Sequence, residues 1–509
     1  MSTRKLEFKN RIFENTCEVI DDVYVFKTLL LGKWVTSSTL RPVYSPIDGK
    51  LIAKIPQLAW EQIDSTLEET YKVGKWSIRE TPGDKRLAIV NKIADLMEET
   101  KEDFIKVLVE NSGKTRKQAE GEVQVSIDRM RSAEIDVRKI FGEYVPGDWS
   151  SHTLESEGIV RKEPYGVVLG IVPFNYPLFD TVNKFVYSII AGNAFVVKPP
   201  SADPLPVLLF AKLVQEAGFP EKAFSVLTIP GKESDKLVSD RRINVISFTG
   251  STNTGIKVLS IAGVKQFIME MGGGNPAIVL NDADIDFSAS KIVFGITSYS
   301  GQRCDAIKLI LAEKVIYEEL KNKIVNELSK VKLGNPWEDA TDMGPLIEPS
   351  SVDEMIEAIE DSKKLGGKII YGGNRLGSTY IEPTLIEVEN KEKLFEMKAY
   401  KEEIFAPIAL ITNFEKDDEA IEIANRRRYG LDAAIFGKNI ERLRRYMRRL
   451  EVGAVYINDY PRHGIGYYPF GGRKDSGIGR EGIGYSIEYV TALKTIVYNY
   501  RGRGIWEYV

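Results

Sequence analysis

Residues 167–172 read VVLGIV, the first of several short apolar runs in the middle of this 509-residue chain. Further runs of this kind follow at 195–198 (FVVK), 224–230 (FSVLTIP), 245–250 (VISFTG) and 276–280 (PAIVL). Helix-period stretches such as 205–217 lie between several of them. Strands that alternate with helices are typical of a parallel sheet covered by helices. We therefore predict an α/β protein with a doubly wound parallel sheet, and Gly, Thr and Ser after the strands mark the edge where ligands bind.

The second half of the chain repeats this alternation. A helical stretch from Ala289, a strand at 309–312 and an amphipathic helix at 318–331 predict a second α/β domain. Residues 142–161, GEYVPGDWSSHTLESEGIVR, have β-type alternation around a Pro-Gly turn and predict a protruding hairpin. The run TALKTIVYNY near the C-terminus is another β-like segment. Exposed strands of this kind promote aggregation unless another subunit covers them.

Composition excludes several classes of protein. The 69 Lys and Arg residues nearly balance 73 Asp and Glu residues, so the net charge of −4 predicts neither a nucleic-acid partner nor an anionic membrane partner. The chain contains no run of about 18 apolar residues and no apolar signal segment at its start, which predicts a soluble, cytoplasmic protein. Only seven glutamines, beside abundant Glu, Lys and Arg, resemble the composition of a protein from a thermophile. A metabolic enzyme fits these features.

Cysteine and histidine are scarce. The two cysteines, Cys17 and Cys304, are too few and too far apart in sequence for a disulfide framework. With His152 and His463 as the only histidines, a Cys/His metal site and a histidine-based triad are both excluded, and we predict no metal. The chemistry must therefore use Cys, carboxylates, Lys or Arg.

Cys304 is a candidate nucleophile. It ends the sequence SGQRC at 300–304, between a helical stretch and an apolar strand, where a turn can expose a thiol. Backbone N–H groups and Arg303 would favour its thiolate form. The alternative is a buried structural cysteine. Cys17, in a polar N-terminal segment, is predicted to have no catalytic function.

Glu270 is a candidate general base. It begins the sequence EMGGGNP at 270–276, at a strand end, and the glycines that follow leave the backbone free to approach a ligand. A carboxyl group beside an apolar, water-poor site has a raised pKa and can act as a base. The alternative is a solvated glutamate before a loop.

Two strand ends are candidate nucleotide-binding segments. The sequence FTGSTNTG at 248–255 follows a strand and opens a helix, so the N–H groups and hydroxyls of Thr249, Gly250 and Ser251 can hold a pyrophosphate. The alternative is an ordinary N-capped turn. Lys198 ends another strand of the same sheet, and its alternative is a surface charge.

Taken in order, these segments closely resemble the NAD(P)-dependent aldehyde dehydrogenase superfamily over about residues 43–495. The motifs that carry the resemblance are VYSPIDGK, ENSGKTRKQAEGEV, PFNYP, AGN…KPP, FTGST, EMGGGNP, GQRC, DMGPLI, EEIFAPI, YGL…G and PFGGRKDSGIGREG. The resemblance implies a nucleotide-binding domain (1–141 and 163–269), a catalytic domain (270–484) and a β flap (142–162 and 485–509). The flap is expected to join subunits into a homodimer or homotetramer.

The resemblance also implies a mechanism. The thiolate of Cys304 attacks the aldehyde, and Asn175 of PFNYP holds the oxyanion together with the Cys304 N–H. Hydride passes to the nicotinamide and leaves a thioester on Cys304. Glu270 then activates the water that hydrolyses this thioester.

Cofactor contacts follow from the same motifs. Glu403 and Phe405 of EEIFAPI match contacts to the nicotinamide ribose and ring, and Lys198 and Ser251 match nucleotide and pyrophosphate contacts. Ser201 stands where relatives that prefer NAD commonly carry Glu. A carboxylate there would repel a 2′-phosphate by roughly 4 kcal/mol at 4 Å and an effective dielectric constant of about 20. The expected cofactor is therefore NADP, with NAD as the alternative.

The substrate is predicted from a motif pattern and from two arginines. Phe174 in PFNYP, together with KPP and GQRC, resembles the non-phosphorylating glyceraldehyde-3-phosphate dehydrogenases of glycolysis. Arg303 and Arg462 flank the nucleophile in the sequence and suit an anionic small-molecule aldehyde such as a phosphate ester. Val125 occupies the position of an arginine in those enzymes, which favours lactaldehyde or succinate semialdehyde as alternatives. A non-catalytic relative is a third hypothesis, but Cys304, Glu270 and Asn175 together argue against it.

Overall fold

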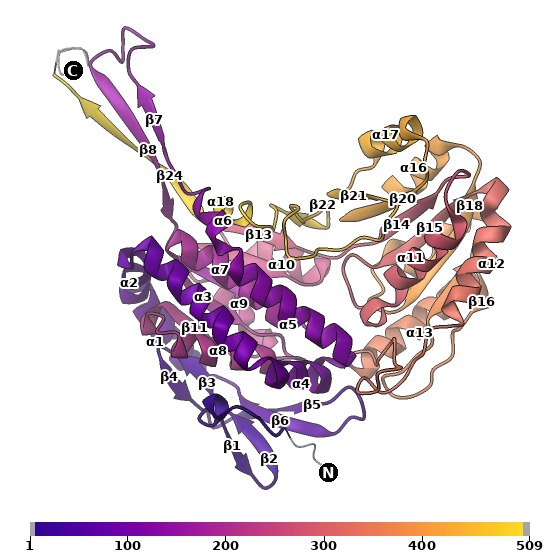
Figure 1. The fold of residues 1–509 in the computed structure, drawn as a ribbon, viewed down its shortest axis with the longest axis horizontal. Helices are drawn as coiled ribbons and strands as arrows, with labels where there is room; N and C mark the ends of the chain where they lie inside the picture. Colours follow the sequence, from indigo (N-terminus) through magenta and orange to yellow (C-terminus); the bar gives the residue numbers. More distant parts are fainter. Residues whose placement is uncertain (1–5, 502–509) are drawn as a thin grey trace.

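The computed structural model describes residues 6–501 and contains two large sheets in separate halves of the molecule, with a three-stranded arm projecting from the first half (Figure 1). The described chain contains no helix that is both long and apolar enough to cross a bilayer. The predicted α/β class with parallel sheets is confirmed.

The first half is built on an eight-stranded sheet with the order β23-β13-β12-β9-β10-β11-β3-β4. Its strands are β3 (Thr28–Leu30), β4 (Lys33–Val35), β9 (Val167–Ile171), β10 (Ala194–Lys198), β11 (Phe224–Val226), β12 (Val245–Thr249), β13 (Gln266–Glu270) and β23 (Gly477–Ile478). The five strands from β13 to β11 run parallel, and β3 and β23 pair antiparallel at the two ends of this group. The predicted strands at 167–172, 195–198, 224–230 and 245–250 all lie in this sheet.

Helices cover this sheet, and the predicted helix at 205–217 is among them. The helices of the first half are α1 (Trp60–Glu69), α2 (Lys75–Glu80), α3 (Gly83–Glu99), α4 (Lys101–Ser112), α5 (Arg116–Arg131), α6 (Ala133–Val137), α7 (Pro177–Ala191), α8 (Leu205–Glu216), α9 (Ser234–Ser239) and α10 (Thr252–Ile261). Phe185 of α7 packs edge-on against Phe210 of α8 and Phe224 of β11, with ring centroids 5.4 and 5.6 Å apart. Such aromatic pairs fix the helices against the sheet.

A separate four-stranded sheet near the N-terminus borders the first half. Its order is β1-β2-β6-β5, with β1 (Cys17–Ile20), β2 (Val23–Phe26), β5 (Leu40–Tyr44) and β6 (Leu51–Pro56). The edge strand β5 lies close to the loop that follows β10. Arg41 of β5 donates a hydrogen bond to the carbonyl oxygen of Ser201 in that loop.

The second half contains a seven-stranded sheet with the order β16-β17-β18-β15-β14-β20-β21. Its strands are β14 (Asn275–Val279), β15 (Ile307–Glu313), β16 (Lys368–Tyr371), β17 (Thr384–Glu387), β18 (Ile408–Phe414), β20 (Asp432–Phe436) and β21 (Ala454–Ile457). Its helices are α11 (Ile285–Thr297), α12 (Tyr317–Leu328), α13 (Pro349–Lys364), α14 (Lys391–Leu394), α15 (Lys398–Lys401), α16 (Asp417–Asn425) and α17 (Ile440–Arg449).

The run at 276–280, grouped with the other apolar runs by its pattern, lies in a different sheet from them. The run at 276–280 belongs to β14, which pairs with β15 and β20 in the second sheet. The chain crosses from β13 to β14 through three successive glycines, Gly272, Gly273 and Gly274. An apolar run shows that a strand is buried, but it does not show in which sheet the strand is buried.

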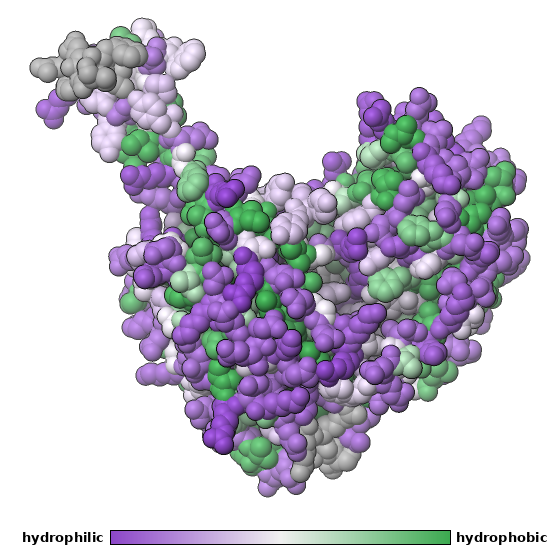
Figure 2. Space-filling view, viewed as in Figure 1, coloured by the Kyte–Doolittle hydropathy of each residue, from purple (hydrophilic) through white to green (hydrophobic). Residues whose placement is uncertain are grey.

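The arm confirms the predicted hairpin and its C-terminal partner. Strand β8 (Ser156–Pro164) pairs antiparallel with both β7 (Glu143–Pro146) and β24 (Thr491–Asn499). The arm region exposes large apolar side chains, including Trp149 at 89% and Leu493 at 71% of their surface. Figure 2 shows such apolar residues along the arm, above its junction with the first half.

The chain between the second sheet and the arm lies with the first half. After the second sheet the chain returns to the first half, where β23 pairs with β13 and protects the edge of that strand. Helix α18 (Ser486–Tyr489) follows, and Ile487 and Val490 are buried in the first core. The arm therefore begins near Thr491 and not at residue 485.

Candidate active site

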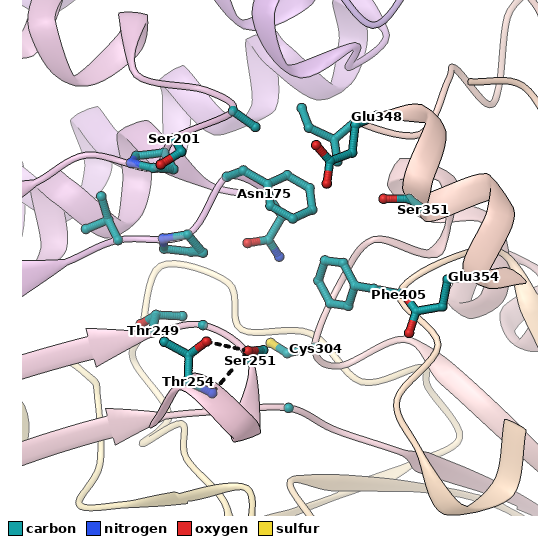
Figure 3. A pocket seen from close by; sticks show the side chains of 18 of the residues that line it. Asn175, Ser201, Thr249, Ser251, Thr254, Cys304, Glu348, Ser351, Glu354 and Phe405 are labelled. Carbon is teal, nitrogen blue, oxygen red and sulfur yellow. Dashed lines mark hydrogen bonds between the residues drawn. The ribbon is translucent and has the colours of Figure 1, made fainter. Parts of the chain in front are cut away.

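A cavity of about 1060 Å³ lies between the two halves and collects most of the predicted site residues (Figure 3). The predicted residues that line it are Phe174, Asn175, Lys198, Ser201, Thr249, Gly250, Ser251, Cys304, Glu403 and Phe405. They come from three strand ends of the first sheet, those of β9, β10 and β12, and from two loops of the second half. Three predicted residues, Glu270, Arg303 and Arg462, do not line this cavity.

Cys304 lies in a turn, as the sequence predicts. The turn before it contains Tyr299 and Ser300 in left-handed conformations, with φ of 48° and 55°. Such conformations are unfavourable for residues with side chains and persist where surrounding contacts hold them. The Tyr299 hydroxyl donates to Ser112 O at 2.8 Å, and the Ser300 hydroxyl donates to Gly344 O at 2.8 Å. The nucleophile loop is therefore fixed by both halves.

Asn275 holds the loop from the other side. Its Nδ2 donates to the carbonyl oxygens of Cys304 and Ala306 at 2.7 and 2.8 Å, and its Oδ1 accepts from Asp432 N at 3.0 Å. Asn275 was not selected from the sequence, because its partners are 29 and more residues away. It is a positioning residue for the candidate nucleophile.

The electrostatic environment of Cys304 differs from the expected one. Burial raises the pKa of its thiol well above the ordinary value, and the charges of Asp305 and Glu403 raise that pKa further. Arg303, which we expected to favour the thiolate, forms a buried ion pair with Asp305 at 2.8 Å. The neighbouring carboxylate thus offsets the charge of the arginine at the thiol.

Asn175, the predicted oxyanion donor, lies beside the Cys304 loop. It lies in the loop between β9 and α7, it is buried, and its amide points into the cavity in Figure 3. Its Nδ2 donates to Gln302 O at 3.1 Å, two residues before Cys304. Asn175 and Cys304 therefore face the same space.

Glu270 ends β13, where the sequence places it, but its carboxyl group faces Gly471 and not the cavity. Both carboxyl oxygens are buried without a hydrogen-bond partner among the described residues. Burial raises its pKa well above the ordinary value, the charge of Glu481 adds to this, and Lys184 opposes it. The raised pKa fits a general base, and a rotation of the side chain is needed to reach Cys304.

One side of the cavity combines a helix N-terminus with a buried carboxylate. Ser251 caps α10 by accepting a hydrogen bond from Thr254 N at 3.4 Å. Glu403 accepts from Gly273 N at 2.8 Å, and burial raises its pKa to about 7. The rings of Phe174 and Phe405 meet edge to face, 5.7 Å apart, and form an aromatic wall.

The predicted substrate residues meet outside this cavity. The guanidinium groups of Arg303 and Arg462 each lie 5.7 Å from the ring centroid of Tyr460, and Lys291 lies 5.5 Å from it. Each cation also has a carboxylate partner: Asp305 pairs with Arg303, and Asp459 pairs with both Arg462 and Lys291. Three cations and two carboxylates thus surround one aromatic ring near the nucleophile loop.

Other cavity residues were not found from the sequence. Arg41 of β5 and Glu348, Ser351 and Glu354 of the segment that begins α13 also line the cavity. These residues belong to no motif that we recognised. Arg41 contacts Ser201, which lies 160 residues away in the sequence. No group of three metal-ligating side chains occurs within residues 6–501.

Comparisons with known proteins agree with this geometry. A family model described as the aldehyde dehydrogenase family matches residues 34–496. The chain belongs to this family.

Relatives match over nearly their full lengths. Lactaldehyde dehydrogenase of Methanocaldococcus jannaschii is 34% identical, over 92% of this chain and 98% of the relative. NADP-dependent glyceraldehyde-3-phosphate dehydrogenase of Streptococcus equinus is 33% identical, over 93% and 98%. The crystal structure of the NADP-dependent glyceraldehyde-3-phosphate dehydrogenase from Bacillus halodurans, complexed with NADP, has a TM-score of 0.89 and 32% identity over 93% of this chain and 99% of that chain. The predicted family resemblance is confirmed.

The glycines between the two sheets have no room for a side chain. A Cβ at Gly273 would lie 2.0 Å from the carbonyl oxygen of Cys304, the same oxygen that Asn275 holds. A Cβ at Gly274 would lie 2.6 Å from the guanidinium of Arg427.

We predict that Gly273→Ala lowers aldehyde oxidation by about 100-fold, because the Cys304 loop must shift and a displacement of about 1 Å has an effect of this size. Steady-state rates and circular dichroism measure activity and folding together. Gly121→Ala is the matched control, since nothing lies within 4 Å of that Cβ. A Gly273→Ala enzyme as active as the Gly121→Ala enzyme would contradict this account of the loop.

Proposed function

We propose that the protein oxidises a short anionic aldehyde to its acid with NADP, and that the substrate is glyceraldehyde 3-phosphate. The product is then 3-phosphoglycerate, formed irreversibly and without inorganic phosphate. The cluster of Arg303, Arg462 and Lys291 around Tyr460 supports the proposal. Its three cations exceed the two carboxylates that pair with them, which leaves a net positive charge. Guanidinium groups bind phosphate through paired hydrogen bonds.

NADP fits the cavity between the halves. The N–H groups at the start of α10 favour a pyrophosphate, and Ser201 leaves the neighbouring position without a carboxylate. Glu403 suits the ribose hydroxyls, and the wall of Phe174 and Phe405 suits the nicotinamide ring. When bound, the cofactor supplies the hydride acceptor.

The chain's own residues perform the acylation step. Cys304 passes its thiol proton to solvent, and the thiolate Sγ forms a bond to the aldehyde carbon while the C=O π electrons move to the oxygen. The amide of Asn175 and the backbone N–H of Cys304 stabilise the negative charge that develops on the aldehyde oxygen. Loss of hydride from the same carbon converts the thiohemiacetal on Cys304 into a thioester.

Glu270 serves the second half of the reaction. Its carboxyl group has no hydrogen bond within the described chain, so a rotation toward Cys304 breaks none. The carboxylate takes a proton from water as the water oxygen attacks the thioester carbon. The acid leaves, and the Cys304 thiolate is restored.

We predict that Glu270→Gln separates the two halves of the reaction. Acylation needs no deacylation base, so a burst of about one reduced cofactor per active site should precede a much slower steady state. Stopped-flow absorbance of the reduced cofactor measures both phases. Cys304→Ser is the control and should show neither phase, while equal losses of burst and steady state in Glu270→Gln would exclude the deacylation role.

A second candidate substrate is lactaldehyde. Asp305 and Asp459 already pair with the two arginines, and ion-paired guanidinium groups have fewer donors free for a phosphate. The relative from Methanocaldococcus jannaschii bears the name lactaldehyde dehydrogenase. Succinate semialdehyde, whose anionic group is a carboxylate, is a third option.

We predict that Arg462→Leu distinguishes these substrates. For glyceraldehyde 3-phosphate it should raise the activation free energy, measured through kcat/KM, by about 2–4 kcal/mol, because the phosphate loses a charged partner. Glyceraldehyde should be almost unaffected. Arg444→Leu, which removes an exposed arginine of α17, controls for net charge. Equal losses of kcat/KM for both aldehydes, or a wild type that prefers glyceraldehyde, would favour lactaldehyde as the substrate.

We also propose that the arm joins subunits into a homodimer or homotetramer in the cytoplasm. The exposed Trp149 and Leu493, together with the unpaired strand edges, support this proposal. A neighbouring subunit would cover both features.

A further inference from the structure

Arg41 is a cavity residue that lies at the Ser201 end of the site. It belongs to the edge strand β5 of the N-terminal sheet, and it lines the cavity together with Lys198, Pro200 and Ser201. Its Nη1 donates to the carbonyl oxygen of Ser201. Because a guanidinium carries five N–H donors, this bond leaves several donors available to a ligand.

Arg41 and Lys198 form a pair of like charges. Burial lowers the pKa of Lys198 to about 8, and the charge of Arg41 contributes to this shift. The two cations therefore lie close enough to interact. Burial also lowers the pKa of Arg41, and no carboxylate opposes either shift. Within residues 6–501 neither side chain forms an ion pair, although Lys198 donates to Pro199 O at 3.4 Å. Two like charges without a counterion at one cavity wall favour an anionic ligand.

The anchoring bond explains why Arg41 remains beside Lys198. The hydrogen bond to Ser201 O ties the guanidinium to the loop that follows β10, and Lys198 ends that strand. The N-terminal sheet and the loop after β10 therefore meet at this end of the cavity. A carboxylate at position 201 would neutralise the pair, whereas the serine side chain leaves the charges free for a ligand.

We propose that Arg41 is a specificity-determining residue that, with Lys198, binds the 2′-phosphate of NADP. The inference rests on the NADP dependence proposed above and adds a residue from outside the nucleotide-binding sheet. A 2′-phosphate brings a dianion to these two cations, whereas NAD presents only a neutral hydroxyl there. Arg41 should therefore act on the preference between the two cofactors more than on binding in general.

The test measures affinity without turnover. Isothermal titration calorimetry of the full chain gives the Kd for NADP, NAD and 2′,5′-ADP in the wild type, Arg41→Gln, Arg41→Lys and the charge control Arg444→Gln. We expect Arg41→Gln to weaken NADP and 2′,5′-ADP by about 10- to 100-fold relative to NAD. Arg41→Lys should recover part of this loss, because it keeps the charge, and Arg444→Gln should leave the Kd ratio as in the wild type.

Each outcome bears on a different claim. If the wild type binds NADP and 2′,5′-ADP tightly and Arg41→Gln changes neither relative to NAD, the role of Arg41 is refuted and NADP dependence stands. If the wild type binds NAD more tightly than NADP and does not bind 2′,5′-ADP, the proposed cofactor itself is wrong. Loss of all three ligands in both Arg41 variants would show a structural role and would also overturn the inference.

Discussion

The hydrogen bond from the Asn275 amide to the carbonyl oxygen of Cys304 is the contact on which the site depends. Asn275 begins β14, and Glu270 ends β13, so only four residues cross between the two sheets. That short crossing brings the base candidate, the glycines and the nucleophile loop together. Because Gly273 leaves no space for even a methyl group against the same oxygen, the backbone of the crossing and the loop of Cys304 determine each other's position.

The cavity has two chemically different ends. At the cofactor end, Arg41 and Lys198 are cations without ion-pair partners in the described chain, and they favour an anion. At the other end lies Cys304, and Glu270 lies outside the cavity wall; burial raises the pKa of both groups. Since burial disfavours charge, both groups favour their neutral forms.

The sequence predicted what lies within motifs and missed what depends on contacts through space. The strands that end at Lys198 and Thr249 and the turn of Cys304 were predictable, because apolar runs and glycines record local structure. The apolar pattern of β14 alone did not predict which sheet contains this strand, since an apolar strand fits either core. Asp305 is the next residue after Cys304, yet its ion pair with Arg303 required the fold. Arg41 contacts Ser201 across 160 residues, and no pattern in one sequence encodes such a contact.

We propose that Cys304 forms a covalent thioester with the substrate; the other cysteine, Cys17, does not line the cavity. Mass spectrometry can detect this thioester in Glu270→Gln protein quenched with acid after mixing with NADP and glyceraldehyde 3-phosphate. We expect a mass increase equal to one phosphoglyceroyl group, located by peptide mapping at Cys304. Unmodified Cys304 after reduced cofactor has formed, or an adduct at Cys17 instead, would contradict it.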